Sequence, residues 1–539
     1  GDINNNAGGI INFNGPAGAA GTFASLNAGG TGTGTINNAT ATSEINVVAG
    51  DVTVGNDDVD TAGIIDVASG STMSGLATLD QTAGTIRGAG TIGVTGLFQQ
   101  TGGVTAGTID INSDGFTQSG TSEIAAGTTV TSAGAQALNG GTIAGNLDGA
   151  GTITVGSGTT SLTGAITNAT NAPTTNAGLI VSGGTLNETG SGSIDTDNNL
   201  ITVSSGTLST DGDGIANDEA VTVSGTGILS ITGTDTIAAL TQTGGSVQGG
   251  SVLSTTTFDQ SGGELALNTT VSASGLSTLE GGTIAGTLGG VGNKTVQTGT
   301  TELTGTISGG ALTVSGTGPG VLNFNNGILN SSLVMDGGTV STESGSTTNT
   351  INNASTTLAS SDSIILAATG TTLGITAGTL QTGAGELTIG SASDTATAGT
   401  VVLTASTTVT SSANSSLNIE RGTLQFGSAS VGSLYSGLAP NSPQSVSIGT
   451  NGTIDLNGNS ATFGNLTGDG LITSGVAGTP TVTLNTTTAS SFGGVIEDGS
   501  GTTALEKSSG TATQTLTGAQ TYTGSTTVNA GELAVTGTG

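Results

Sequence analysis

The amino-acid sequence predicts an all-β chain that folds as a single long parallel β-helix, with about 20 residues in each coil. Two observations support this prediction. Short runs of aliphatic residues alternate with Thr, Ser, Asn or Asp, and one short phrase returns about every 20 residues. A unit of that size cannot bury its apolar face alone, whereas stacked copies bury a continuous interior. At that coil length the chain makes roughly 27 coils.

The expected strands are short and clearly marked. Examples are residues 151–155, 221–223, 386–389 and 453–456, where apolar and polar residues alternate. Such alternation indicates a strand with one buried and one solvated face. Gly and Asn punctuate the strands where the chain must bend. Helices are not expected, because Gly and β-branched residues interrupt every window long enough to hold a helical period.

The repeat consists of an apolar residue, a Gln two positions later and then one or two Gly. It occurs at 79–84, 98–103, 116–120, 240–245 and 258–263. A longer echo aligns 128–167 with 269–308 without a gap, and more than half of the positions are identical. Self-similarity at this period is typical of a solenoid, whereas propellers have longer, aromatic-marked repeats and immunoglobulin-like sandwiches carry aromatic cores.

Composition excludes several classes of function. The chain has 36 Asp+Glu against 4 Lys+Arg, a net charge of −32, so we expect no binding to nucleic acid or to anionic membranes. It contains no Cys and no His. Disulfides, zinc-thiolate sites and a Ser-His-Asp triad are therefore excluded. The regular spread of Ile, Leu and Val argues against a disordered linker.

Residues 516–533, LTGAQTYTGSTTVNAGEL, resemble the autotransporter-associated β-strand repeat, whose pattern is Leu-x-Gly-x-x-x-Tyr-Thr-Gly-x-Thr-x-Val-x-x-Gly-x-Leu. Residues 452–470 and 494–510 are similar to other units of autotransporter passenger regions. We therefore divide the chain into divergent solenoid coils at 1–420 and passenger-like coils at 421–539. The resemblance implies a right-handed parallel β-helix, exported and displayed at the bacterial cell surface or outer membrane. It also implies a translocator β-barrel, which is not in this sequence.

One segment has the composition of a cation site. Residues 211–219, DGDGIANDE, supply the oxygen ligands that Ca²⁺ prefers, and Asp211, Asp213, Asn217 and Asp218 are the candidate ligands. The spacing departs from an EF-hand, whose first and twelfth loop positions are here Ser209 and Ala220. The alternative reading is an acidic loop protruding from a coil. No other cofactor is expected.

We assign no catalytic residue and expect that the chain is not an enzyme. The four basic residues, Arg87, Lys294, Arg421 and Lys507, lie far apart in sequence. The leading interpretation is an extracellular structural and adhesive solenoid, which binds its own copies, host or neighbouring cell surfaces through glycans or proteins, or forms filaments or a surface layer. The alternative is a β-helix enzyme that processes polysaccharides through carboxylates, with Asp57, Asp58 and Asp60 as the first cluster to test.

Overall fold

The computed structural model describes residues 3–14, 22–26, 34–168, 177–197, 199–318, 320–410, 412, 414–433, 435 and 444–537. It confirms the predicted fold class, an all-β parallel solenoid of about 23 turns with roughly 20 residues per turn. The turns are fewer than the roughly 27 expected, because some coils carry insertions. Leu373, for example, pairs with Val401, and Leu417 pairs with Val446.

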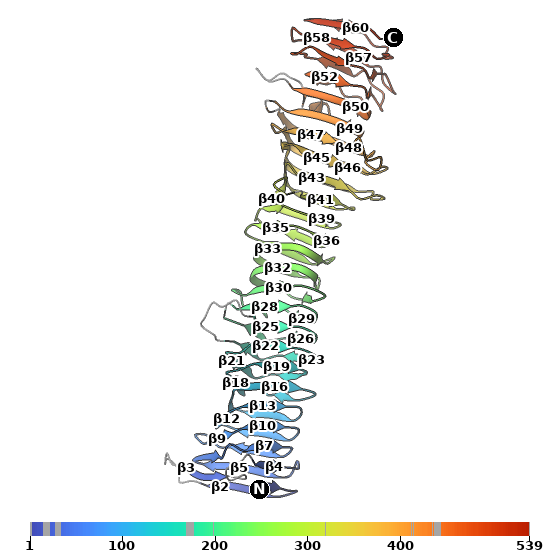
Figure 1. Ribbon diagram of the computed structural model, residues 1–539. Coiled ribbons are helices and arrows are strands. Elements are labelled where there is room, and N and C mark those ends of the chain that lie inside the picture. Colours follow the sequence, from blue (N-terminus) through green and yellow to red (C-terminus); the bar gives the residue numbers. More distant parts are fainter. Residues whose placement is uncertain are drawn as a thin grey trace. The chain divides into compact units, whose positions relative to one another are not determined.

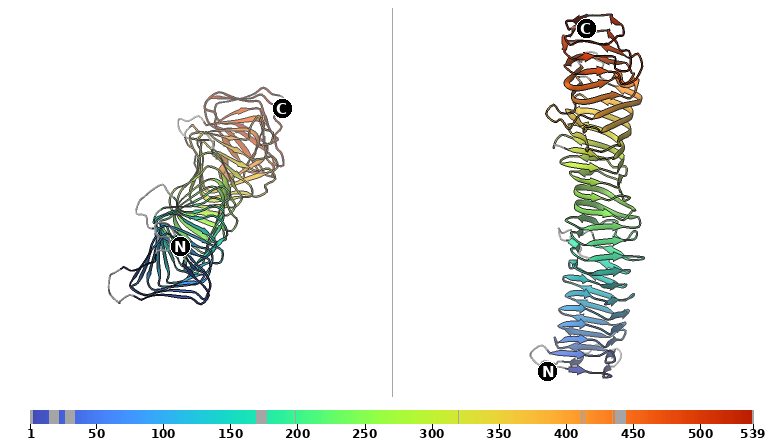
Figure 2. Two further views of the ribbon diagram at one scale, coloured as in Figure 1. Left: turned by 60° about the horizontal axis from the view of Figure 1, so that its bottom comes forward. Right: turned by 90° about the vertical axis from the view of Figure 1, so that its right-hand side faces the viewer.

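The chain forms two compact units, residues 1–257 and 258–539. Within each unit, successive coils lie on one another and their strands run parallel (Figure 1). The right-hand view of Figure 2 shows the same stacking within each unit from another side. Among the described residues the one helical element is the 3-10 turn η1 (Ala429–Ser433). No described helix has the length and hydrophobicity of a membrane span.

In unit 1 the coils build three faces. Face A consists of β1 (Ile3–Asn5), β4 (Thr35–Asn38), β7 (Asp58–Thr61), β10 (Thr78–Gln81), β13 (Leu97–Gln100), β16 (Gly115–Ser119), β19 (Gln136–Asn139), β22 (Ile153–Val155), β25 (Ala177–Val181), β28 (Leu200–Val203), β30 (Ala220–Val223) and the first part of β32 (Asp235–Gln248).

Face B consists of β2 (Ile10–Asn14), β5 (Glu44–Ala49), β8 (Ile64–Val67), β11 (Thr85–Gly88), β14 (Val104–Gly107), β17 (Glu123–Ile124), β20 (Gly141–Ile143), β23 (Thr159–Leu162), β26 (Thr185–Glu188), β29 (Thr207–Thr210), β31 (Ile228–Ile231) and the last part of β32. Face C is a nine-stranded sheet of β3 (Thr22–Leu26), β6 (Asp51–Val54), β9 (Thr72–Leu76), β12 (Thr91–Val94), β15 (Asp110–Ser113), β18 (Thr129–Ser132), β21 (Asn146–Gly149), β24 (Ala165–Thr167) and β27 (Ser193–Asp195).

Unit 2 continues the pattern after β33 (Val252–Leu265), which contains the boundary, and several of its strands are long. Its strands are β34 (Thr270–Ala273), β35 (Ser277–Leu279), β36 (Gly282–Ile284), β37 (Thr287–Gly289), β38 (Lys294–Val296), β39 (Thr300–Leu303), β40 (Thr306–Ser315), β41 (Val321–Phe324), β42 (Ile328–Asp336), β43 (Thr339–Thr342), β44 (Asn349–Ser361), β45 (Ser363–Leu366), β46 (Thr372–Thr382), β47 (Glu386–Ile389), β48 (Thr400–Thr410), β49 (Ser416–Phe426), β50 (Ser445–Asp455), β51 (Ala461–Phe463), β52 (Asn465–Gly468), β53 (Leu471–Thr473), β54 (Thr481–Leu484), β55 (Ser490–Phe492), β56 (Val495–Ile496), β57 (Ala504–Lys507), β58 (Thr513–Leu516), β59 (Thr526–Val528) and β60 (Glu532–Val535).

The interior is built from equivalent side chains stacked coil on coil. Val59, Leu79, Phe98 and Phe116 occupy one in-register column of face A, and all four are fully buried. The rings of Phe98 and Phe116 stack with centroids 5.3 Å apart. Because the strands alternate, the residue two positions after each of these also points inward. Parallel ladders and this aliphatic column therefore share the work of holding each unit together.

The Gln of the repeated phrase lies inside the solenoid. Gln81, Gln100 and Gln118 are fully buried and in register. Nε2 of Gln100 donates to Oε1 of Gln81 at 3.1 Å, and Nε2 of Gln118 donates to Oε1 of Gln100 at 3.3 Å. The same amides also donate to backbone carbonyls, as Gln100 does to Glu123 at 3.0 Å. The repeat thus encodes an internal amide ladder as well as an apolar column.

The echo between 128–167 and 269–308 is also visible in the structure. Strands β18 to β24 of unit 1 and strands β34 to β40 of unit 2 begin at equivalent positions of the two aligned segments. The same sequence phrase therefore builds the same run of strands in both units. One core position differs in kind, because Lys294 in β38 stands where the aligned segment has Ile153 in β22.

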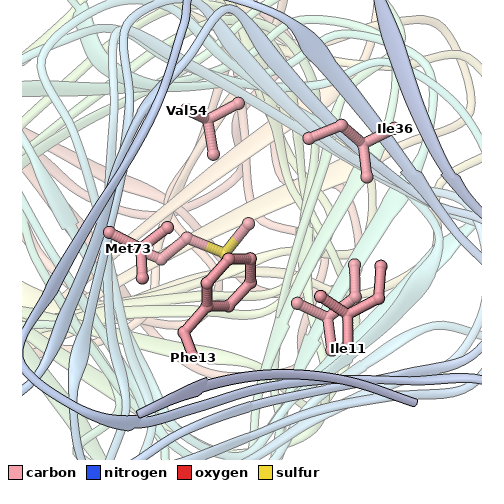
Figure 3. A pocket seen from close by; sticks show the side chains of 7 residues that line it. Ile11, Phe13, Ile36, Val54 and Met73 are labelled. Atoms are coloured by element: carbon pink, nitrogen blue, oxygen red, sulfur yellow. The ribbon is translucent and has the colours of Figure 1, made fainter. Parts of the chain in front are cut away.

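A small cavity lies in the interior of unit 1 and is lined only by apolar side chains (Figure 3). Ile11, Phe13, Ile36, Val54 and Met73 face one another across it. Its volume is about 10 Å³, close to the smallest space that holds one water molecule. It is a packing gap in a dry core and too small for a ligand.

Candidate functional site

The acidic segment 211–219 forms a loop that follows β29 and leads into β30. The predicted ligands Asp211, Asp213, Asn217 and Asp218 are all exposed. Oδ2 of Asp211 accepts a hydrogen bond from the backbone N–H of Gly190 at 2.9 Å. Asp213 has a positive φ of 26°, and its N–H donates to the carbonyl of Thr234.

One Gly of this loop packs against a neighbouring coil in a way that the sequence does not reveal. A Cβ added at Gly214 would lie 2.2 Å from Oε2 of Glu188, so a larger residue there would displace that carboxylate. Across the described residues, no three His, Cys, Asp or Glu side chains are grouped closely enough to hold a metal ion. Calcium binding at 211–219 therefore stays a prediction.

That prediction has a direct test. A specific Ca²⁺ site stabilises the folded chain by mass action, so CaCl2 should raise the Tm above its value in MgCl2 at equal ionic strength. The variant Asp213→Asn should remove this difference. If Ca²⁺ and Mg²⁺ give equal melting temperatures in the native chain, the loop is an ordinary acidic turn.

Two buried carboxylates next to this loop, Glu188 and Asp235, were missed by the sequence analysis, and Glu219, the last residue of the loop, is buried as well. Burial raises the pKa of the Glu188 carboxyl, and the N–H of Asp211, which donates to Oε2 at 3.2 Å, opposes this shift. Burial also raises the pKa of Asp235, against hydrogen bonds from the Thr236 N–H and the Thr210 hydroxyl. Strand parity could have revealed Glu188, since it lies two residues after the inward Leu186.

Glu219 anchors the end of the loop. Its Oε1 accepts the backbone N–H of Thr196 at 2.7 Å, and its Oε2 accepts the Thr196 hydroxyl at 2.5 Å. Loop and neighbouring coil are joined by one carboxylate that satisfies two donors. These contacts assign Glu219 a structural role.

The second acidic cluster is divided between the interior and the surface. Asp57 is buried and accepts the N–H of Gly34 at 2.8 Å, whereas Asp58 and Asp60 point outward from β7. Asp60 is in register with Asp80 on the next coil, and burial together with the Asp58 carboxylate raises the pKa of Asp60. The pKa of Asp80 is raised by burial and by the Asp60 and Asp58 carboxylates. Thus Asp58, Asp60 and Asp80 form an outward acidic group.

The basic residues are used within the fold. Arg87 forms an ion pair with Asp66, with Nε and Oδ2 2.8 Å apart, the one such pair in the described part of the chain. Arg421 donates to the carbonyls of Ser391 and Ala392, both at 3.2 Å. Lys294 and Lys507 are fully buried, and burial lowers the pKa of both amines.

Each buried lysine binds backbone carbonyls. Nζ of Lys294 donates to the carbonyls of Gly292 at 2.9 Å and Gly290 at 3.3 Å. Nζ of Lys507 donates to Ser509 at 2.6 Å and Gly510 at 3.1 Å. The Lys507 amine thus closes the turn that follows strand β57.

The C-terminal motif is held together by short polar contacts between coils. Asp498 accepts the hydroxyl of Thr523 at 2.6 Å and its N–H at 3.0 Å, and these bonds lower the pKa of Asp498. The Tyr522 hydroxyl lies 2.8 Å from that of Thr526. A Cβ at Gly524 would lie 2.4 Å from the carbonyl oxygen of Thr503. Thr523 and Gly524 of the motif therefore clamp this coil to the preceding one, whereas the contact of Tyr522 lies within its own coil.

Comparison with protein families places this clamp in a known repeat. Residues 509–535 match the model of the passenger-associated-transport-repeat. Comparisons with curated proteins and with solved structures return no match. The family match confirms the expected autotransporter-associated repeat near the C-terminus, and it supports an autotransporter passenger with a β-helical fold that is surface-displayed or secreted.

Proposed function

We propose that this passenger solenoid is an extracellular structural and adhesive element, which attaches a bacterial cell to its own kind, to host or neighbouring cell surfaces, or to further copies of itself. The proposal rests on one observation, the outward polar columns. Along face A, Asn37, Asp60, Asp80, Gln99 and Thr117 are in register on successive coils.

Such columns offer the same kind of contact at a spacing of about 4.8 Å. A single hydrogen bond at the surface is weak, because water competes for both partners. Repetition turns weak contacts into firm attachment once several are engaged together. A repeating polar surface on a carrier of this kind therefore suits adhesion better than it suits catalysis.

The acidic surface predicts how self-association responds to salt. Two copies that each carry a net charge of −32 repel each other, and added ions screen this repulsion. Cells that display the chain should therefore aggregate more at high than at low ionic strength, and Ca²⁺ should act at lower concentration than Na⁺. The double variant Asp60→Asn/Asp80→Asn should aggregate at lower salt than the native chain.

The measurement is sedimentation of displaying cells, with cells that display no passenger as the control. Aggregation that stayed the same at every salt concentration, with and without Ca²⁺, would contradict the charge argument. Attachment to neither its own cells nor foreign cells would contradict the adhesive function itself.

Filament or surface-layer formation is a further form of the same proposal. The terminal coils of a solenoid expose sheet edges that can pair with another copy. Electron microscopy of the purified chain distinguishes the two forms. Fibres of solenoid width support a filament, and isolated particles at high concentration and high salt contradict it.

The outward group of Asp58, Asp60 and Asp80 keeps a second candidate function open, the processing of polysaccharides. Raised carboxyl pKa values are typical of general acids, and paired carboxylates carry glycoside hydrolysis. Incubation with acidic polysaccharides followed by product analysis tests it. Turnover that Asp60→Asn abolishes would replace the adhesive proposal with an enzymatic one.

A further inference from the structure

A surface groove of about 440 Å³ crosses four neighbouring strands of face C in unit 1, β9, β12, β15 and β18. The labels β9, β12 and β18 mark this region in Figure 1. The cavity shown in Figure 3 lies inside the coil, whereas this groove is open to solvent and is lined largely by outward positions. It is far larger than the interior gap.

A β-bulge at Gly75 shapes one end of the groove. Ile92 pairs with Met73 but Val94 pairs with Leu76, so β9 holds one extra residue between these pairs. Gly75 has a φ of +75°, and a Cβ there would lie 2.4 Å from the carbonyl oxygen of Val54. Only glycine fits this position. A bulge bends its strand and strengthens the local twist, which hollows the face beside it.

Gly93 forms the floor, and nothing in the fold requires a glycine there. It is in register with Asn112, and Asn112 is in register with Thr131. The nearest atom to an added Cβ is Cβ of Ser74 at 3.6 Å, an ordinary contact, and Gly93 has no positive φ. Glycine inside a strand is unfavourable compared with a β-branched residue. Its effect here is to leave the column empty at one position and keep the groove open.

The lining selects a class of ligand. The floor is carbon surface from Gly75, Gly93 and Ala133, and the Asn112 amide and Asp114 carboxylate are exposed beside it. The backbone groups here are already paired between parallel strands, so an extended peptide cannot add to this face as an extra strand. A sugar ring, with C–H faces and a rim of hydroxyls, matches a carbon floor with amide and carboxylate acceptors.

The charge of the groove lining restricts the class of ligand further. None of the described residues that line the groove is basic, and Asp114 lies on it. Uronates, sulfates and phosphates would meet an unpaired carboxylate without a cation to offset it. The groove crosses four strands that lie about 4.8 Å apart, so a linear chain of rings can lie along it with about one ring on each coil.

We propose that this groove binds a linear, uncharged oligosaccharide, with Gly93 as the position that admits it and with Asn112 and Asp114 as its hydrogen-bonding groups. The inference rests on the adhesive function proposed above and names the class of cell-surface partner for it. It assigns the contact to one site of unit 1.

Calorimetric titration of the full chain tests the proposal. The probes are cellotetraose and maltotetraose, with tetragalacturonate as the acidic probe of equal length. We expect at least one neutral tetrasaccharide to bind and the acidic one not to bind. Gly93→Thr fills the floor with a β-branched side chain and should weaken neutral binding by roughly tenfold or more, because ring and side chain compete for one space.

Gly374→Thr is the matched control. Gly374 lies in β46 of unit 2, points outward, has no positive φ, and its added Cβ would be 3.8 Å from the nearest atom, the carbonyl oxygen of Asn349. This variant should bind like the native chain. Asn112→Ala, an exposed truncation, gives a second test that does not depend on the folding of Gly93→Thr, and it should weaken binding as well.

The outcomes separate the two proposals. Failure of both neutral probes to bind, stronger binding of tetragalacturonate, or equal binding by native chain, Gly93→Thr and Asn112→Ala would overturn the groove assignment. Cell attachment that persists in Gly93→Thr would then leave the adhesive function intact through other surfaces. Neutral-sugar binding by a chain that attaches to no cell would overturn the adhesive function and keep the groove.

Discussion

At the residue scale, Lys294, one of the two buried lysines, shows what a positively charged side chain does in the interior of this chain. Lys294 replaces the core residue Ile153 of the aligned segment, where the carbonyl of Gly151 is bound instead by Nδ2 of Asn168 at 3.0 Å. In the second segment Gly309 occupies the position of Asn168, and the lysine amine serves the carbonyl of Gly292 in its place. The core lysine and the missing asparagine thus compensate for each other, because each segment keeps one side-chain donor for the equivalent carbonyl.

Lys294→Ile should reduce the pH dependence of stability in alkaline solution. Burial lowers the folded pKa of this amine below 10.5, so the ammonium is disfavoured in the folded state. The buried ammonium lowers the free energy of unfolding at neutral pH. This loss disappears as pH rises from the lowered folded pKa to above 10.5, where the amine is neutral in both the folded and the unfolded state. The native Tm should therefore rise relative to that of Lys294→Ile between pH 7 and pH 10.

The matched control for that comparison is Arg87→Gln, which alters an exposed cation with a carboxylate partner. Its Tm should stay parallel to that of the native chain over the same pH range, because an arginine does not titrate there. Parallel curves for native chain and Lys294→Ile would show that burial does not perturb the amine.

Thr523→Val tests the clamp at the C-terminal repeat. Hydrogen bonds from Thr523 lower the pKa of Asp498, so its carboxylate adds stability above pH 3.8 that is lost as pH falls through the lower folded pKa. In the valine variant the pKa of Asp498 should rise toward 3.8, which NMR titration of the carboxyl groups measures. The Tm of this variant at neutral pH should be lower than that of the native chain. Thr523→Ser keeps the hydroxyl and should behave like the native chain.

At the element scale, the amide ladder couples neighbouring strands more tightly than an apolar column would. Gln100 in β13 donates to both Gln81 and the Glu123 carbonyl and accepts from Gln118, so three coils share one side chain. An apolar column tolerates a shift between coils, whereas an amide ladder fixes their register, because a shifted amide loses its partners. The ladder lies beside Phe98 and Phe116, where one aromatic and one polar column run in parallel.

Gln100→Leu should destabilise unit 1 by about 1–3 kcal/mol, since it leaves the buried amide oxygen of Gln81 without its donor and the Glu123 carbonyl with the Thr105 hydroxyl in place of two donors. In this variant, the backbone amides of β13 and β16 should exchange their hydrogens faster than in the native chain. The neighbouring Gln99 points outward from the same strand, so Gln99→Leu is the control and should leave both exchange and stability nearly unchanged. Equal effects of the two substitutions would refute the ladder's role.

At the scale of the whole molecule, charge and repetition set the response to solvent. A net charge of −32 with a single ion pair in the described part of the chain leaves most carboxylates without a cation. Each coil touches mainly its neighbours, so stability is close to a sum of coil and interface contributions. The repulsion is therefore spread along the stack and is reached by dissolved ions.

Melting temperature should accordingly rise with ionic strength. Salt at about 0.15 M screens charges more than about 8 Å apart, so it relieves repulsion mainly between carboxylates that lie two or more coils apart. Scanning calorimetry from low to physiological NaCl should show the increase, and Asp60→Asn/Asp80→Asn should show a smaller one. A Tm that falls or stays constant with salt would mean that the carboxylates are already offset.

The sequence alone determined the period, the parallel stacking and the inward or outward parity of most strands, because alternation and repeat length are local properties of the chain. It also located the C-terminal repeat through its fixed spacing of Leu, Tyr, Gly and Val. The tertiary structure decided what lies one coil away. The approach of Glu188 to Gly214 and the groove above Gly93 both depend on which residues, about 20 positions distant, stack on each other. Insertions, and bulges such as the one at Gly75, shift which residues pair between coils. The accumulated shift cannot be read from any local sequence pattern.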